Sequence, residues 1–169
     1  MLVSVAGGAP LPRLIHETPL ADVSRIIGSI SSGILLPVRA VLPVMMRQQA
    51  GSIICIASDA AKIATPGEVA IGAAMAAVVM FCRALAIEAK RSRVRVNCIT
   101  PSIVKNTPFY DTLMEDPFAS KLFKKAEGLA LLGVVEPNDV ASLVGFLAGD
   151  QSSRLTGQTI SVNGGISAA

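Results

Sequence analysis

Hydrophobic and polar positions follow two patterns along the chain, short apolar runs and longer stretches with helical spacing. Four apolar runs have the length of strands that are buried on both faces, and they lie at 2–5, 51–57, 94–99 and 159–162. Three longer stretches repeat their apolar residues at helical spacing, at about 20–47, 68–90 and 138–147. The stretch from about 100 to 133 shows neither pattern, so we expect it to be rich in loops. Strands that alternate with helices predict an α/β fold with a parallel sheet.

The composition indicates that much of the surface is covered by something other than water. Only 16% of the 169 residues are charged, against about 25% in an average globular protein. A membrane or a partner subunit could provide that cover. The uncharged stretch from Val69 to Cys82 is shorter than the ~20 residues of a spanning helix. We therefore expect one domain over 1–169 that forms an oligomer and does not enter a membrane.

Charge and cysteine content exclude other classes of function. The net charge is only +3, and the basic cluster at 90–95 has no aromatic residues among its cations. A solvated helix end explains this cluster, so we expect no nucleic-acid binding. Cys55, Cys82 and Cys98 lie in apolar segments without the spacing of a metal site or of paired disulfides. We expect free thiols, no metal site and a reducing, cytoplasmic location.

Several segments resemble the short-chain dehydrogenase/reductase family in order and spacing. They are LVSVAGG (2–8), GSIICIAS (51–58), the tract RALAIEAKRSRVRVNCITP (83–101) and LTGQTISVNGG (155–165). The resemblance implies a partial Rossmann-like, doubly wound parallel sheet of about four strands, beginning at the family's fourth strand. The first βαβαβ unit, on the order of 80 residues, would be absent together with its Gly-rich phosphate loop. We therefore expect no cofactor-binding residues in the chain, and Gly7-Gly8 is interpreted as a turn that ends a strand.

The resemblance also assigns positions to the family's catalytic residues, which are a serine, a Tyr-x-x-x-Lys pair and an asparagine. In the family the serine polarises the carbonyl, the tyrosine transfers a proton and the lysine lowers the tyrosine pKa. Ser58 occupies the serine position. The tyrosine, lysine and asparagine positions hold Ile71, Met75 and Ile30. Since none of these side chains carries a proton or a charge, we expect no redox catalysis of the family type.

Four polar residues remain as candidates for chemistry, each with a simpler interpretation beside it. Ser58 and Asp59 either face a pocket or satisfy backbone N–H groups at a strand end. His16, the only histidine, lies in a loop that in the family is near the substrate mouth, or is simply solvated. Tyr110, the only tyrosine, lies in a segment that resembles the family's substrate-covering region, or packs like any aromatic residue.

Three functions fit these observations. The first is a cofactor-independent isomerase, cyclase, dehydratase or lyase that acts on a small apolar carbonyl compound. Its polar groups would be Ser58, Asp59, His16 and Tyr110.

The second is a non-catalytic structural or regulatory subunit. It would assemble through the helix at 68–90, through the C-terminal helix and strand, and by pairing of the edge strand at 2–5. The third is half of a split NAD(P)-dependent oxidoreductase. The losses at Ile71, Met75 and Ile30 count against it, because a simple split would have kept the catalytic residues.

Overall fold

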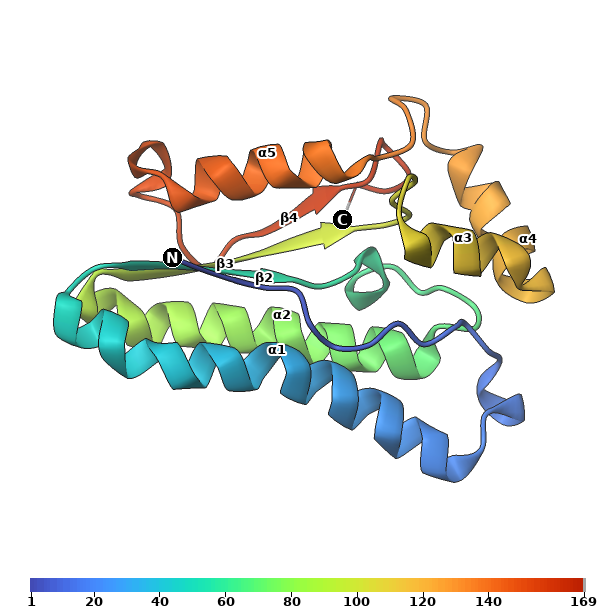
Figure 1. Ribbon diagram of the computed structural model, residues 1–169, viewed down its shortest axis with the longest axis horizontal. Helices are drawn as coiled ribbons and strands as arrows, with labels where there is room; N and C mark the ends of the chain where they lie inside the picture. Colours follow the sequence, from blue (N-terminus) through green and yellow to red (C-terminus); the bar gives the residue numbers. More distant parts are fainter. Residues whose placement is uncertain (169) are drawn as a thin grey trace.

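Four parallel strands form a single sheet in the order β1-β2-β3-β4 (Figure 1). The strands are β1 Leu2–Ser4, β2 Gly51–Ile56, β3 Val94–Pro101 and β4 Thr159–Val162. The computed structural model describes residues 1–168. The two central strands, β2 and β3, are buried along most of their length, which explains their nearly continuous apolar sequences. The predicted α/β fold with a parallel sheet of four strands is confirmed.

Helices cover both faces of this sheet and close one of its ends (Figure 1). They are α1 Leu20–Gln48, α2 Val69–Ala89, α3 Pro108–Glu115, α4 Pro117–Glu127 and α5 Pro137–Ala148. The long helices α1 and α2 lie side by side on one face, and α5 lies on the other. The short helices α3 and α4 lie beyond the carboxyl ends of the strands, where ligands bind in open parallel sheets.

Three clusters of buried side chains hold these layers together. The largest lies between the sheet and the pair α1–α2, and includes Ile34, Ile53 and Val78. A second cluster joins α5 to the opposite face of the sheet through Leu147. The third lies under α3 and α4 around Phe123, and it anchors these two helices over the end of the sheet.

The prediction of a loop-rich stretch at 100–133 is wrong, because α3 and α4 lie within it. Each begins at a capping residue followed by proline. The Thr107 hydroxyl accepts from the Tyr110 backbone N–H at 3.1 Å. The Asp116 carboxylate accepts from two backbone amides of the next turn, at 3.0 and 2.7 Å. Such cap-proline pairs favour a helix start, but both helices are too short to give a long apolar stripe.

Two helical segments have the length and composition of membrane-spanning helices, Leu20–Gln48 and Val69–Ser92. The second contains the uncharged stretch from Val69 to Cys82 and continues beyond Arg83. Both segments pack on the sheet here, and residues of α2 such as Ala74 and Val78 are fully buried. Core helices of globular proteins have the same composition, so the absence of membrane contact stays a prediction.

Candidate functional site

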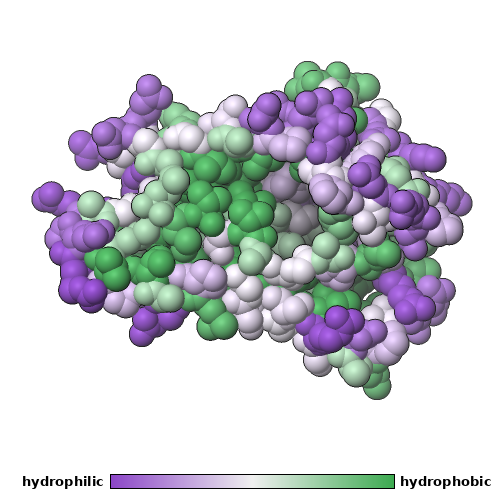
Figure 2. Space-filling model, viewed as in Figure 1, coloured by the Kyte–Doolittle hydropathy of each residue, from purple (hydrophilic) through white to green (hydrophobic). Residues whose placement is uncertain are grey.

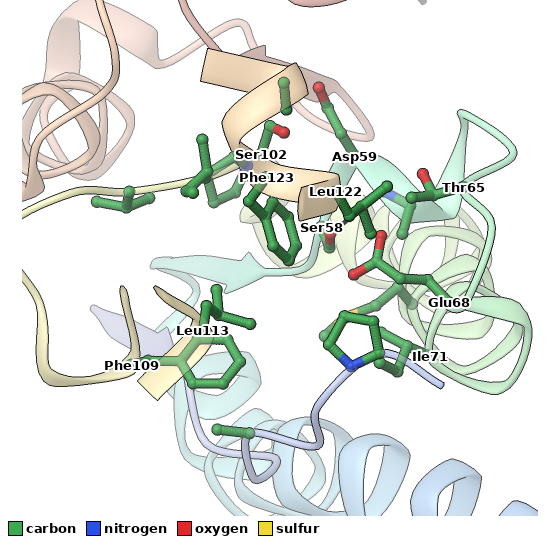
Figure 3. Close-up of a pocket in the computed structure, with 18 of the residues that line it drawn as sticks. Ser58, Asp59, Thr65, Glu68, Ile71, Ser102, Phe109, Leu113, Leu122 and Phe123 are labelled. Carbon is green, nitrogen blue, oxygen red and sulfur yellow. Dashed lines mark hydrogen bonds between the residues drawn. The ribbon is translucent and has the colours of Figure 1, made fainter. Parts of the chain in front are cut away.

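A pocket of about 300 Å³ opens at the carboxyl ends of β2 and β3 (Figure 3). The loops after β1, β2 and β3, the first turns of α2 and the inner sides of α3 and α4 contribute its walls. The lining is mainly apolar and includes Ile30, Ile71, Met75, Leu113, Leu122 and Phe123. Its volume and its few polar groups are typical of a site for a small organic molecule.

The four positions that the family resemblance assigns to catalysis meet in this pocket. Ser58 follows β2, Ile30 projects from α1, and Ile71 and Met75 lie one helical turn apart on α2. Ile30 is fully buried and Ile71 nearly so, and both belong to the main core cluster. The residues that replace the family's proton relay therefore extend the hydrophobic core into the pocket wall.

Ser58 both caps a short helix and faces the pocket. Its oxygen accepts a hydrogen bond from the Ala60 backbone N–H at 3.2 Å, at the start of the 3-10 helix Asp59–Ala61. No acceptor for the Ser58 hydroxyl proton is present among residues 1–168. The hydroxyl can therefore donate to a ligand carbonyl. Ser58 thus satisfies a backbone N–H group and also faces the pocket.

Asp59 is buried, and its carboxylate is engaged by the C-terminal segment. One oxygen accepts from the Ser161 hydroxyl at 3.0 Å and lies 3.6 Å from the Lys62 ammonium. The other accepts from the Asn163 amide at 2.5 Å and from the Ser167 hydroxyl at 3.1 Å. Because Ser167 and its neighbour Ile166 line the pocket, Asp59 positions part of the pocket wall.

Glu68 is the pocket residue that sequence reasoning missed. It stands at the N-cap of α2, yet its side chain makes no cap hydrogen bond and is directed into the cavity (Figure 3). Burial raises the pKa of Glu68 from 4.5 to about 7, and a hydrogen bond with Thr65 opposes part of this rise. A carboxyl group that titrates near neutral pH can both take up and return a proton. The sequence feature that could have identified Glu68 is its place as a single carboxylate directly before a helix whose first charged residue is Arg83.

The structure does not bring His16 to the pocket. This residue lies in the 3-10 helix Ile15–Glu17 with 74% of its side chain exposed, and its ring is 3.8 Å from the Glu17 carboxylate. The pocket lining does not include it. Its position supports the interpretation as a solvated loop histidine.

Tyr110 lines the pocket, and its hydroxyl donates to the Glu127 carboxylate at 2.7 Å. This hydrogen bond joins α3 to α4 and raises the pKa of Tyr110. Tyr110 thus fixes the two helices over the pocket, and its proton is committed to Glu127.

Tyr110→Phe is expected to lower the free energy of unfolding by about 1 kcal/mol, the net contribution of one hydrogen bond. Urea denaturation of the wild-type and variant proteins measures the difference. Because the phenyl ring remains in the wall, ligand affinity should change by less than about threefold. A larger loss of affinity with unchanged stability would instead indicate that the hydroxyl contacts the ligand.

The three cysteines are buried free thiols. They lie near one another in the core, and Cys55 and Cys98 are partners across β2 and β3. Hydrogen bonding with the Cys55 and Cys98 thiols, followed by burial, raises the pKa of Cys82. Within residues 1–168 no group of three or more His, Cys, Asp or Glu side chains could hold a metal ion.

Comparison with known proteins gives one consistent family for this chain. A family model described as enoyl-(acyl carrier protein) reductase matches residues 1–167. Dehydrogenase/reductase SDR family member 4 of Bos taurus is 30% identical over 165 residues, covering 98% of this chain and 58% of the relative.

Solved structures give the same result. A putative short-chain dehydrogenase/reductase from Burkholderia xenovorans superposes with a TM-score of 0.87 at 29% identity, covering 99% of this chain and 65% of that one. A 3-oxoacyl-[acyl-carrier protein] reductase from Brucella melitensis with bound NAD gives 0.85 at 25% identity, with 99% and 62% covered. The chain thus spans between about half and two thirds of the length of its relatives.

Proposed function

The chain belongs to the short-chain dehydrogenase/reductase family, and we propose that its pocket acts on a small, largely apolar carbonyl compound without hydride transfer. The observation that carries this proposal is the apolar character of Ile30, Ile71 and Met75 in the pocket that contains Ser58. Relatives are named as oxidoreductases and reductases. Reduction of a carbonyl needs a proton donor at the carbonyl oxygen, and no residue at the family's tyrosine or lysine position can provide one.

The pocket residues do not fit the family's use of a nicotinamide cofactor, so we propose no role for that cofactor here. The remaining groups suit a reaction in which protons move and the oxidation state does not change. Isomerases, cyclases, dehydratases and lyases that act on carbonyl compounds carry out such reactions. In this proposal the Ser58 hydroxyl donates to the carbonyl oxygen while the apolar wall holds the carbon skeleton.

Binding of 1-tetralone, an uncharged bicyclic ketone, tests the proposed pocket. Titration followed by NMR should perturb the signals of Ile71, Met75 and Leu113, which line the cavity. Ser58→Ala is expected to weaken binding by about three- to tenfold, corresponding to one hydrogen bond of roughly 1 kcal/mol. Ser142→Ala, at an exposed serine on α5, is the matched control and should bind as the wild type does. Shift changes confined to another surface, or no binding, would refute the proposal.

A second candidate is a structural subunit, and the open edge of the sheet favours it. β1 pairs with β2 on one side only, and β1 is the first strand in the sheet order. Hydrophobic side chains gather on the face that this edge presents, between α1 and α5 (Figure 2). The outer side of α2 also exposes Met80 and Ile87. An exposed sheet edge can pair with a strand of another chain, and large exposed apolar patches mark interaction sites.

We propose self-association through the 2–5 edge, the helix at 68–90 and the C-terminal helix and strand, in the cytoplasm. Sedimentation of the purified chain at micromolar concentration tests this. An oligomer that dissociates when Ile87 is changed to glutamate supports the α2 surface. A monomer would count against the structural role and leave the pocket proposal in place. A split oxidoreductase is less well supported, since the substitutions at Ile71 and Met75 lie in this chain.

A further inference from the structure

We propose that Glu68 is the acid–base residue of this pocket, and that the reaction is proton transfer at the carbon next to a ketone carbonyl. The substrate class is then an uncharged ketone with an acidic α C–H bond, which passes through its enol form. This inference rests on the proposed function, because it needs a carbonyl compound held at Ser58.

The position of Glu68 distinguishes it from the other titratable residues of the pocket. Asp59 and Tyr110 also line the cavity, but their polar atoms are engaged by the C-terminal segment and by Glu127. Thr65 lies beside the Glu68 carboxyl group and lowers its pKa, while the Thr65 hydroxyl donates to the Ile63 carbonyl at 3.1 Å. A carboxylate offers about four lone-pair sites, so acceptor capacity remains for a substrate proton.

The direction of the Glu68 side chain supports the same role. Serine, threonine, aspartate and asparagine at a helix N-cap usually turn their side chains back to the backbone N–H groups of the first turn, whereas a glutamate at this position is free to point elsewhere. Glu68 makes no such bond, and its carboxyl group instead points towards the space bordered by Ser58 and Leu122 (Figure 3). A carboxyl group and a hydroxyl thus face one cavity from α2 and from the end of β2.

The surroundings of Glu68 give it a suitable basicity. Apolar groups such as Ile71 and Leu122 share the pocket with it, and burial raises the pKa of Glu68 to about 7. A carboxylate with that pKa is a stronger base than a solvated glutamate. It also gives its proton back readily, as acid–base catalysis near neutral pH requires.

The step balances within the pocket and needs no oxidant or reductant. The Glu68 carboxylate takes the α-proton, the C–H bonding pair becomes the C=C bond of the enolate, and the carbonyl π pair moves to oxygen. The Ser58 hydroxyl donates a hydrogen bond to that oxygen and stabilises its negative charge. The Glu68 carboxylic acid then returns the proton to the same carbon, or to the γ-carbon of an unsaturated ketone, which shifts the double bond.

Exchange of the α-protons of 1-tetralone in heavy water, followed by proton NMR, tests this inference. Glu68→Gln should lower the exchange rate by at least about 100-fold, the usual contribution of a general base. Its dissociation constant for 1-tetralone should stay within about threefold of the wild-type value, because the side-chain volume is conserved. Glu88→Gln, at an exposed glutamate on the same helix, is the control and should exchange as the wild type does.

The pH profile gives a readout that a purely structural role would not change. The exchange rate should rise with pH and level off above about pH 7, as Glu68 loses its proton. Asp59 on the 3-10 helix and Tyr110 on α3 are the other titratable groups that face the pocket; α4 and the loops after β1 and β3 contribute none to its lining. The profile should therefore be lost in Glu68→Gln.

The outcomes separate this inference from the proposed function. Wild-type exchange in Glu68→Gln, or a wild-type protein that binds 1-tetralone without exchanging its α-protons, overturns the role of Glu68 and leaves the pocket proposal in place. Failure of the wild type to bind the ketone overturns both. Loss of exchange together with loss of binding in Glu68→Gln would make Glu68 a binding residue and would also overturn the inference.

Discussion

Glu68→Gln is expected to make the protein more stable at about pH 8, by on the order of 2–3 kcal/mol. Burial raises the pKa of Glu68 to about 7 in the folded protein, whereas in the unfolded chain it has its ordinary value of 4.5. Between these values the folded state binds more protons than the unfolded state, so stability falls as pH rises through this window. A neutral glutamine does not carry the cost of a buried negative charge.

Urea denaturation at about pH 4.5 and about pH 8 measures the effect. The free energies of unfolding of wild type and Glu68→Gln should lie close together at the lower pH and diverge at the higher one. Glu88→Gln changes an exposed carboxylate on the same helix and should follow the wild type at both. A glutamine variant that is less stable than wild type at the higher pH would contradict the burial of the Glu68 charge. The expected gain also fits a residue kept for chemistry at the expense of stability.

Asp59→Asn is expected to lower the free energy of unfolding by about 3 kcal/mol, because a buried carboxylate that serves several donors is lost. In the wild type Asp59 accepts from Ser161, Asn163 and Ser167 and pairs with Lys62. An asparagine keeps one acceptor oxygen but turns an N–H₂ group towards donors. Asp111→Asn, at an exposed position on α3, is the control and should change stability by less than about 0.5 kcal/mol.

The same variant should also loosen the pocket. Ile166 and Ser167 line it, and Asp59 holds Ser167 directly. Affinity for 1-tetralone should therefore fall in Asp59→Asn even at temperatures where the variant is folded. Unchanged stability with a complete loss of α-proton exchange would instead indicate that Asp59 itself takes part in the proton transfer.

The strands, the long helices and the meeting of the four family positions could be predicted from the sequence. Each buried strand is a nearly continuous apolar run, and the repeat of apolar residues marks α1, α2 and α5. Ser58 follows one parallel strand, and Ile71 and Met75 lie on the helix that comes next. Because ligand sites lie at the carboxyl ends of parallel strands, this proximity follows from the topology.

The partners of Asp59 and the setting of Glu68 could not be predicted in this way. Asp59 bonds to Asn163, which is 104 positions away, and nothing local specifies that pairing. The basicity of Glu68 depends on its burial in a pocket that α3 and α4 help to close. The apolar pattern of the sequence did not predict these two short helices. His16 lies exposed in the fold, in agreement with its interpretation as a solvated loop histidine.

The most direct test of the account is one incubation of the wild-type chain with 1-tetralone and NADPH in heavy water, followed by proton NMR. Proton transfer replaces the α-hydrogens of the ketone by deuterium, while the NADPH signals stay constant and no alcohol forms. That is the predicted result. Formation of the corresponding alcohol as NADPH is consumed would contradict the account, and so would α-proton signals that do not decay faster than in protein-free buffer.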